Sequence, residues 1–298
     1  MSYIFEPQKV LHLRLEKEKK KPKLDNIYLI TEKFDGWFGF IDYHPETGWG
    51  YPRNESRVIP SWMFAKEYFE RFIPTPRTAT RFIFEAIIYD TPFHILNGIF
   101  NRKREDAKDV IFILHDALRL DSFWIEGRKD NLAGERYKYL LETELPYNID
   151  DRHRLSIAPL LAVSKHELVW NDCFEKVIDN SGEGIILKAE DGIYTPGKRN
   201  SSLMKMKLEE TFDLLVTDMF WTTGEKGNPS LNLKLQNKEG IEVCVRVPKD
   251  KDIAKFTTKE NPIGSVAMIK CMKKLEDGSY REPRFQVIRY DKQPHEID

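Results

Sequence analysis

Two shortages in the sequence each exclude a class of protein. The three cysteines, Cys173, Cys244 and Cys271, are too few and too widely spaced for a disulfide framework, and no CxxC pair suggests a zinc site. No apolar run approaches the roughly 20 residues that a membrane helix needs, and the N-terminal MSYIFEPQKV lacks the apolar core of a secretory signal. We therefore expect a cytoplasmic protein that does not contact a membrane.

The sequence also lacks an excess of charge of either sign. Lys and Arg number 47 against 48 Asp and Glu, a formal net charge of −1, so the net charge by itself indicates no nucleic-acid partner. Hydrophobic residues make up 41% of the chain and aromatic residues 12%, which is enough to form a core and excludes a wholly disordered chain. The length of 298 residues predicts two modest domains.

Runs of β-branched and aromatic residues predict a fold rich in strands. From residue 211 on, strand candidates are separated by Gly, Pro and Asn, with a helix-like insert near 251–256, a pattern typical of a small oligonucleotide-binding (OB) barrel. We place the domain boundary between residues 208 and 209. The expected strands are 26–34, 37–43, 81–90, 109–118, 202–210, 212–223, 230–237, 241–248, 265–275 and 284–291, with helix-like stretches at 61–72 and 127–145 and a hairpin at 181–194.

Charged side chains interrupt several of these apolar strands. A buried Glu or Lys is costly unless it is paired or bound to a ligand. Lys205 and Lys207 are two residues apart on a strand and so point to the same face, where two ammonium groups repel each other unless an anion such as phosphate lies between them. The whole set comprises Lys33, Asp35, Glu85, Asp116, Glu183, Lys188, Lys205 and Lys207.

This set of residues indicates phosphoryl or nucleotidyl transfer. A lysine surrounded by other cations loses part of its proton affinity, so Lys33, beside a turn between two strands, could act as a nucleophile. Glu85 and Glu183 could hold Mg²⁺ near the same phosphate. No Walker-type or GxGxxG loop occurs, which disfavours a P-loop enzyme and a Rossmann dinucleotide binder. A lysine cluster at 17–23 could add phosphate contacts.

The order of these residues resembles the motifs of the covalent nucleotidyltransferases, the superfamily that contains ATP-dependent DNA ligases, RNA ligases and mRNA capping enzymes. Glu32-Lys33-Phe34-Asp35-Gly36 is similar to the KxDG nucleotidyl-lysine motif. Similar motifs follow in the family's order: Ser56-Arg57, FEA around Glu85, HDAL at 115–118, EGIILK at 183–188, LMKMK at 203–207 and RYDK from Arg289 to Lys292. The chain most resembles a minimal, viral-type ATP-dependent DNA ligase.

The resemblance implies a fold and a reaction. The fold class is α+β, with a nucleotidyltransferase (adenylation) domain of antiparallel sheets and helices at 1–208 and a C-terminal OB-fold β-barrel at 209–298. Lys33 would attack the α-phosphate of ATP and form a lysyl-AMP, with Mg²⁺ or Mn²⁺ held by Glu183 and Glu85. AMP would then pass to the 5′-phosphate of nicked duplex DNA, and the 3′-hydroxyl would displace it and seal the nick. The protein is expected to work as a monomer.

The resemblance also implies roles for the other motif residues. Thr31, Glu32 and Asp35 would belong to the nucleotide site, with Thr31 at the adenine N6 group, and Glu85 would contact the ribose or the metal. His115 takes the base-stacking position that is usually Phe or Tyr. Lys188, Lys205 and Lys207 would line the α-phosphate, Arg289 and Lys292 would orient pyrophosphate, and Arg57 would hold the 5′-phosphate at the nick.

One position departs from the family pattern, and three alternatives remain. Many DNA ligases have Arg two places after the KxDG glycine, where this chain has Phe38. An RNA ligase shares the lysine chemistry but usually lacks the RxDK barrel, and a capping guanylyltransferase has both domains but requires GTP. A non-catalytic oligonucleotide-binding protein would give no reason for the lysines and Glu183 to occur together.

Overall fold

The computed structural model describes residues 6–13, 25–89, 91, 93–101, 109–121, 131–145, 154–223, 227–248 and 261–298. The chain divides into two compact units, Met1–Met206 and Lys207–Asp298, close to the boundary that we expected after residue 208. The lysine cluster at 17–23 and the helix-like insert at 251–256 lie outside the described residues. No helix of the described part is long and apolar enough to span a bilayer.

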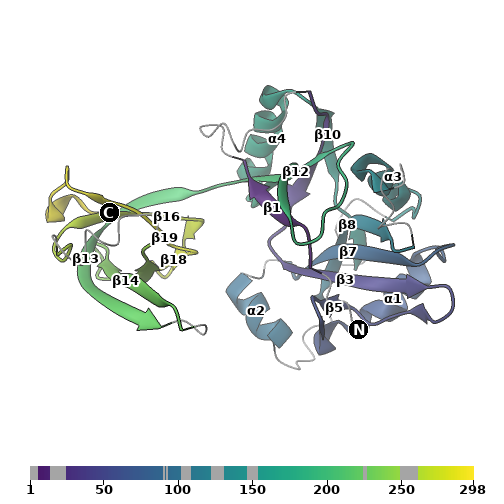
Figure 1. Ribbon diagram of the computed structural model, residues 1–298, viewed down its shortest axis with the longest axis horizontal. Helices are drawn as coiled ribbons and strands as arrows, with labels where there is room; N and C mark the ends of the chain where they lie inside the picture. The colour runs from purple at the N-terminus through teal and green to yellow at the C-terminus, as the bar shows by residue number, and fades with distance from the viewer. Residues whose placement is uncertain are drawn as a thin grey trace. The chain divides into compact units, whose positions relative to one another are not determined.

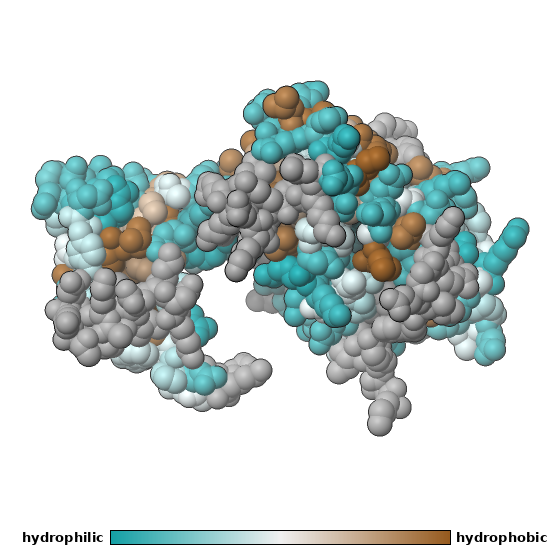
Figure 2. Space-filling model, turned by 45° about the horizontal axis from the view of Figure 1, so that its top comes forward, coloured by the Kyte–Doolittle hydropathy of each residue, from teal (hydrophilic) through white to brown (hydrophobic). Residues whose placement is uncertain are grey.

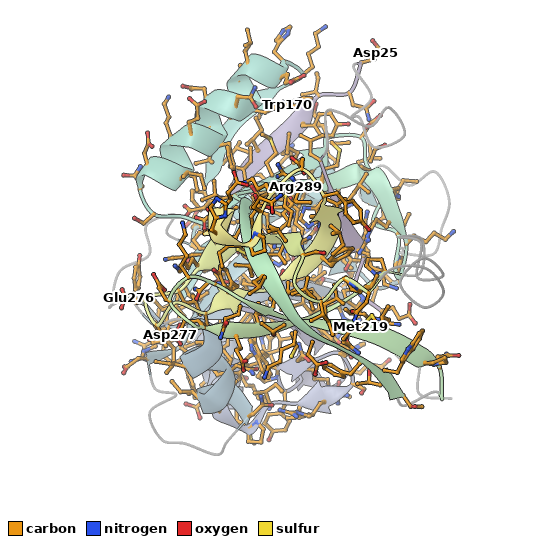
Figure 3. The ribbon with its side chains drawn as sticks, turned by 90° about the vertical axis from the view of Figure 1, so that its left-hand side faces the viewer. Asp25, Trp170, Met219, Glu276, Asp277 and Arg289 are labelled. Atoms are coloured by element: carbon orange, nitrogen blue, oxygen red, sulfur yellow. The ribbon has the colours of Figure 1, made fainter. Side chains whose placement is uncertain are left out.

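The first sheet of unit 1 has the strand order β1-β12-β11-β2-β10. Strands β11 and β2 are antiparallel, with Gly184 opposite Lys33. Helix α4 (Glu167–Asp179) packs on this sheet beside β10 (Figure 1), and it buries Trp170, Cys173 and Val177 at helical spacing; Trp170 is labelled in Figure 3. The strands are β1 (Lys9–His12), β2 (Tyr28–Lys33), β10 (Leu160–Ser164), β11 (Gly184–Ala189) and β12 (Arg199–Lys207).

The second sheet of unit 1 has the order β6-β5-β3-β7-β8-β9, with β4 paired to β3. An aromatic core packs on one of its faces, and Trp62, Phe69, Phe84 and Phe112 are fully buried there. Its elements are β3 (Trp37–His44), β4 (Gly48–Trp49), β5 (Arg53–Asn54), β6 (Arg57–Val58), β7 (Thr80–Ile87), β8 (Ile111–Arg119) and β9 (Leu155–Ile157), with η2 (Pro60–Trp62), α1 (Ala65–Phe72), α2 (Phe93–Asn101) and α3 (Ala133–Leu141).

The chain passes from the first sheet to the second directly after Lys33. Strand β2 pairs with β10 and β11, whereas β3 pairs with β7, so the two strands around Asp35-Gly36 do not form a hairpin. A Cβ atom on Gly36 would lie 2.4 Å from the carbonyl oxygen of Ala86, so only glycine lets the chain cross this close to β7. The end of β2 therefore lies between the two sheets.

The expected hairpin at 181–194 is wrong. Only β11 forms there, because its two edges pair with β2 and β12, and the residues beyond it turn away. Ile193 makes an isolated bridge with Leu132 instead. The sequence alternation was sufficient to predict one strand but not the partner that each edge finds.

Unit 2 contains the five expected C-terminal strands, all antiparallel, in the order β15-β14-β13-β16-β19. Their inward residues, including Leu214, Leu233 and Ile269, form a separate core. Among the described residues no ladder joins β15 to β19, so the expected barrel is not closed by pairing. The elements are β13 (Glu210–Thr223), β14 (Pro229–Gln236), β15 (Glu242–Arg246), β16 (Val266–Cys271), β17 (Lys273–Lys274), β18 (Tyr280–Arg281), β19 (Arg284–Arg289) and η5 (Pro294–Glu296).

Each unit buries its apolar residues in its own core. On the face that Figure 2 shows, hydrophilic residues cover most of the described surface of each unit, and hydrophobic residues form small patches. Each unit thus has the core that an independent domain requires.

Candidate active site

A cavity of about 260 Å³ lies inside unit 1, where the end of β2 meets the second sheet. Both sheets contribute to its walls, because β2, β11 and β12 belong to the first sheet and β3, β7 and β8 to the second. Its lining combines cations, carboxylates and aromatic rings: Gln8, Val10, Thr31, Glu32, Lys33, Phe34, Phe38, Glu85, His115, Asp116, Ile186, Lys188, Tyr194, Leu203 and Lys205.

Lys33 is the last residue of β2, and it is held by a carboxylate that lies just before the neighbouring strand β11. Its Nζ donates to Oε2 of Glu183, which directly precedes β11, and to the carbonyl oxygen of Phe34 at 3.3 Å. The register explains the pair, because Gly184 lies opposite Lys33. The Lys33 side chain is 19% exposed and that of Glu183 is 10% exposed, so a ligand in the cavity can reach the amine.

Glu85 carries the second carboxylate of the site and points from β7 into the cavity. Its pKa is raised to about 7, chiefly by burial; Lys33 acts against this rise, and the nearby charges of Glu183 and Asp35 add to it. Burial also raises the pKa of Glu32. Close to neutral pH, Glu85 is therefore poised between its acid and its carboxylate form.

The two carboxylates fit a magnesium ion that is shared with a phosphate ligand. The described residues contain no cluster of three His, Cys, Asp or Glu side chains that could hold a metal alone. Mg²⁺ usually takes only one or two protein carboxylates and completes its octahedron with substrate phosphates and water. Glu85 and Glu183 supply this kind of donor set, since both carboxylates lie near Lys33.

A buried charge network forms another part of the cavity wall. Lys188 donates its Nζ to the carbonyl oxygen of His115 and, at 3.3 Å, to Oδ2 of Asp116. Arg136 of α3 clamps the same carboxylate with two hydrogen bonds of 2.7 and 3.2 Å. Burial alone would raise the pKa of Asp116, but Arg136 and Lys188 hold that pKa well below its usual range.

Two groups in this wall have their proton affinity lowered by burial. Burial, and then the charge of Lys188, lowers the pKa of His115 to about 3, so its imidazole is uncharged near neutral pH. Burial likewise lowers the pKa of the Lys188 ammonium, although Asp116 acts against that shift. His115 therefore presents a neutral ring to the cavity.

The structure brings most of the predicted nucleotide site together. Thr31, Glu32, Lys33, Glu85, His115, Lys188 and Lys205 all line the cavity, and Glu183 contacts Lys33. Asp35 does not line it, but its charge acts on Glu85.

Four other predicted residues have partners elsewhere. Arg57 of β6 donates to Oδ1 of Asn101 at 3.2 Å. In unit 2, Lys207 pairs with Glu282 at 3.2 Å, and Arg289, labelled in Figure 3, and Lys292 both contact Oδ2 of Asp213, at 3.3 and 2.7 Å.

Sequence reasoning missed two residues that shape the site. Arg136 is 4% exposed, and its position between Ala133, Tyr137 and Leu140 on the buried face of α3 was a signal that could have revealed it. Tyr194 lines the cavity, and its hydroxyl accepts a 3.0 Å hydrogen bond from the backbone N–H of Gln8. No local pattern predicts that contact, because the two residues are far apart in sequence.

Comparisons with known proteins agree with this site. Residues 85–207 match the family model of the ATP dependent DNA ligase domain. A DNA ligase of Natronomonas pharaonis is 26% identical over 212 residues, which cover 67% of this chain and 35% of the relative. The chain thus spans about a third of the length of that curated relative.

Solved structures show the same fold. One is a Lig E DNA ligase, described as binding DNA with a minimal scaffold. It matches with a TM-score of 0.66 at 16% identity, and the match covers 94% of this chain and 99% of the Lig E chain. The ATP-dependent DNA ligase of bacteriophage T7, in complex with ATP, has a TM-score of 0.56 at 17% identity and covers 95% and 98%.

These findings confirm two predictions. The chain has the predicted α+β fold, in which a nucleotidyltransferase-type domain is followed by an OB-fold unit, like these solved structures. Its resemblance to the ATP-dependent DNA ligases is confirmed by the family model, by the curated relative and by the fold.

Proposed function

We propose that this protein is an ATP-dependent DNA ligase that seals 5′-phosphate/3′-hydroxyl nicks in duplex DNA. The observation that carries the proposal is the amine of Lys33, which is paired with Glu183 and lines a cavity together with three carboxylates and two further lysines. That arrangement suits an amine attacking a phosphate whose charge must be offset. The match of residues 85–207 to an ATP-dependent DNA ligase domain supports the same reaction.

In the first step, the lone pair of the Lys33 amine forms a bond to the α-phosphorus of ATP, and the bond from that phosphorus to pyrophosphate breaks. An ammonium has no lone pair, so the ion pair with Glu183 must open and the amine must lose a proton. Lys188 and Lys205 would neutralise the charge that develops on the α-phosphate. Mg²⁺, held by Glu85 and Glu183, would supply Lewis-acid stabilisation of the phosphate oxygens.

In the later steps, the nucleotide leaves the lysine for DNA. The 5′-phosphate of the nick attacks the lysyl-AMP, the phosphorus–nitrogen bond breaks, and a DNA-adenylate forms. The 3′-hydroxyl then attacks the 5′-phosphorus, releases AMP and closes the strand. We propose that Arg57 binds the 5′-phosphate in place of its present partner Asn101. We further propose that Arg289, Lys292 and Lys207 leave their carboxylate partners and bind the phosphates of the nucleotide.

A labelling experiment tests the proposal. Incubation with α-³²P-ATP and Mg²⁺, followed by denaturing electrophoresis, should leave label on the wild-type protein and none on Lys33→Ala. Lys176→Ala is the matched control, because Lys176 is an exposed lysine paired only with Asp172 on α4, and it should be labelled like the wild type. Labelling from α-³²P-GTP alone would instead indicate a capping guanylyltransferase.

A second measurement separates the remaining alternatives. The wild type should seal a nick in duplex DNA faster than a nick between RNA strands, whereas the reverse order would indicate an RNA ligase. Absence of label from either nucleotide would leave the non-catalytic alternative. A monomeric state and a cytoplasmic location remain part of the proposal, and sedimentation of the wild type tests the first of them.

A further inference from the structure

Phe38 lines the active-site cavity, although the family pattern has an arginine at its position in many DNA ligases. It lies on β3 directly opposite Glu85 of β7, and residues paired across a ladder project to the same face of the sheet. A phenyl ring has no hydrogen-bond donor for a phosphate. Phe38 therefore cannot bind a phosphate as an arginine at this position would.

Phe38 is held in place by one contact of its backbone and one of its ring. Its backbone carbonyl oxygen accepts a 2.8 Å hydrogen bond from Nδ2 of Asn54. Its side chain packs against the apolar cluster of Phe40, Ile83, Leu118 and Tyr194. Phe38 is thus a fixed part of the cavity wall and not an exposed ring on a loop.

The second ring of this wall is that of His115. The centroids of the two rings are 6.5 Å apart with an interplanar angle of 47°, at the long end of the range in which aromatic rings interact. Because they do not pack tightly on each other, both keep surface toward the cavity that they line. Burial keeps the imidazole neutral, with its pKa lowered to about 3, so both rings present an uncharged π surface.

We propose that Phe38 is a further binding residue for the nucleotide, packing against the nucleobase of ATP together with His115. The inference rests on the proposed function, because it assigns a contact within the same nucleotide site. The phenyl ring would supply aromatic contact that an imidazole, smaller than the usual Phe or Tyr, supplies less well. Phe38 would then act in adenylation of Lys33 and not in holding the nick.

The test compares two phenylalanines of the same strand. Phe38→Leu should raise the KM for ATP in Lys33 adenylation about threefold to tenfold with little change in kcat, since an aromatic contact adds about 0.5–1.5 kcal/mol beyond its buried area. Phe38→Tyr should keep the wild-type KM. Phe40→Leu is the control, because Phe40 belongs to the same cluster but does not line the cavity, and its KM should not change.

A double-mutant cycle adds a readout that a merely structural role would not move. In a His115→Phe background, the larger ring should take over part of the contact, and Phe38→Leu should then raise the KM by a smaller factor than in the wild type. Equal factors in the two backgrounds would contradict a shared base contact.

Other outcomes overturn the inference in recognisable ways. If Phe38→Leu leaves the KM for ATP unchanged but slows sealing of a pre-adenylated nick, the residue serves DNA. If Phe38→Arg improves such sealing at an unchanged KM for ATP, the position has kept the family's DNA contact. A wild-type protein that takes no label from ATP would instead refute the proposed function itself.

Discussion

Glu85 and Arg136 show how burial gives single residues their properties in this site. Among the described residues Glu85 has no forked cationic partner, and its pKa is raised to about 7, chiefly by burial. Asp116 is also buried, yet Arg136 and Lys188 hold its pKa far below the usual range. Glu85 and Asp116 line the same cavity, but the pKa of one is raised and that of the other is lowered. Each of these shifts leads to a measurable prediction.

Replacing Glu85 by Gln should change the pH dependence of stability. A carboxyl whose pKa rises from 4.5 to about 7 on folding makes the native state bind more protons than the unfolded state between these values, so wild-type stability falls as pH rises through that window. Glu85→Gln cannot ionise and should lack this fall, gaining about 1–3 kcal/mol relative to wild type between pH 4 and pH 8. Urea unfolding of both proteins at pH 4 and at pH 8 measures this gain in stability. If the stabilities of the variant and the wild type change with pH in the same way, the prediction is contradicted.

Removing Arg136 should cost more stability than removing a comparable arginine elsewhere. Arg136→Met leaves the Asp116 carboxylate buried with Lys188 as its remaining cation, and we expect a loss of about 3–5 kcal/mol. The control is Arg81→Met, since Arg81 forks onto Asp42 at 2.6 and 2.7 Å but Asp42 is 22% exposed; there we expect about 1–2 kcal/mol. Urea unfolding of the two variants compares these losses, and equal losses would show that burial of the pair is unimportant.

At the scale of elements, the short crossing from β2 to β3 decides where Lys33, the proposed nucleophile, lies. Lys33 ends a strand of one sheet and Trp37 begins a strand of the other. Because Gly36 has no side chain, the crossing stays against β7, next to Glu85. The active-site cavity therefore depends on a close backbone approach as well as on its charged residues.

A methyl group on Gly36 should test that dependence. Gly36→Ala places a Cβ 2.4 Å from the Ala86 carbonyl oxygen, a backbone atom that cannot rotate away, whereas Gly39→Ala meets the ring of Phe84 at 2.3 Å. Both should lose about 1–3 kcal/mol from overpacking. Only Gly36→Ala should also slow lysyl-AMP formation, measured in single turnovers at a temperature where both variants are folded. Equal slowing in both would mean that general strain, not the crossing, is responsible.

At the scale of the whole molecule, the two units have separate hydrophobic cores. Separate cores predict separate cooperative transitions, since two-state unfolding is a property of single domains. Calorimetry of the full chain should resolve two transitions, one for each unit.

Core variants should assign these transitions. Leu233→Ala empties a fully buried position of unit 2, and Ile41→Ala does the same in unit 1. Each should lower only one transition, by about 2–5 kcal/mol in the unit that it affects. If both variants shift one common transition, the two units unfold as a single cooperative body.

How much of this protein could be predicted from sequence depended on the range of the interactions. Runs of β-branched and aromatic residues between turn residues predicted the five strands of unit 2 and the strands expected at 26–34, 37–43, 81–90 and 109–118, which correspond to β2, β3, β7 and β8, because strand formation has a strong local signal. The order of the motifs along the chain led to the resemblance that the comparisons confirm. Arg136 was missed because a charged residue is normally expected on the exposed face of a helix, whereas Arg136 lies on the buried face of α3.

The sequence by itself determined which residues could carry nucleotidyl chemistry and in which order they follow one another. Only the tertiary structure decided that β2 and β3 belong to different sheets, that Glu183 takes the amine of Lys33, and that Lys207 pairs with Glu282 in unit 2. The reason is physical: local patterns encode the conformation of a strand, whereas the partner of each strand edge and each buried charge depends on which distant segments pack together.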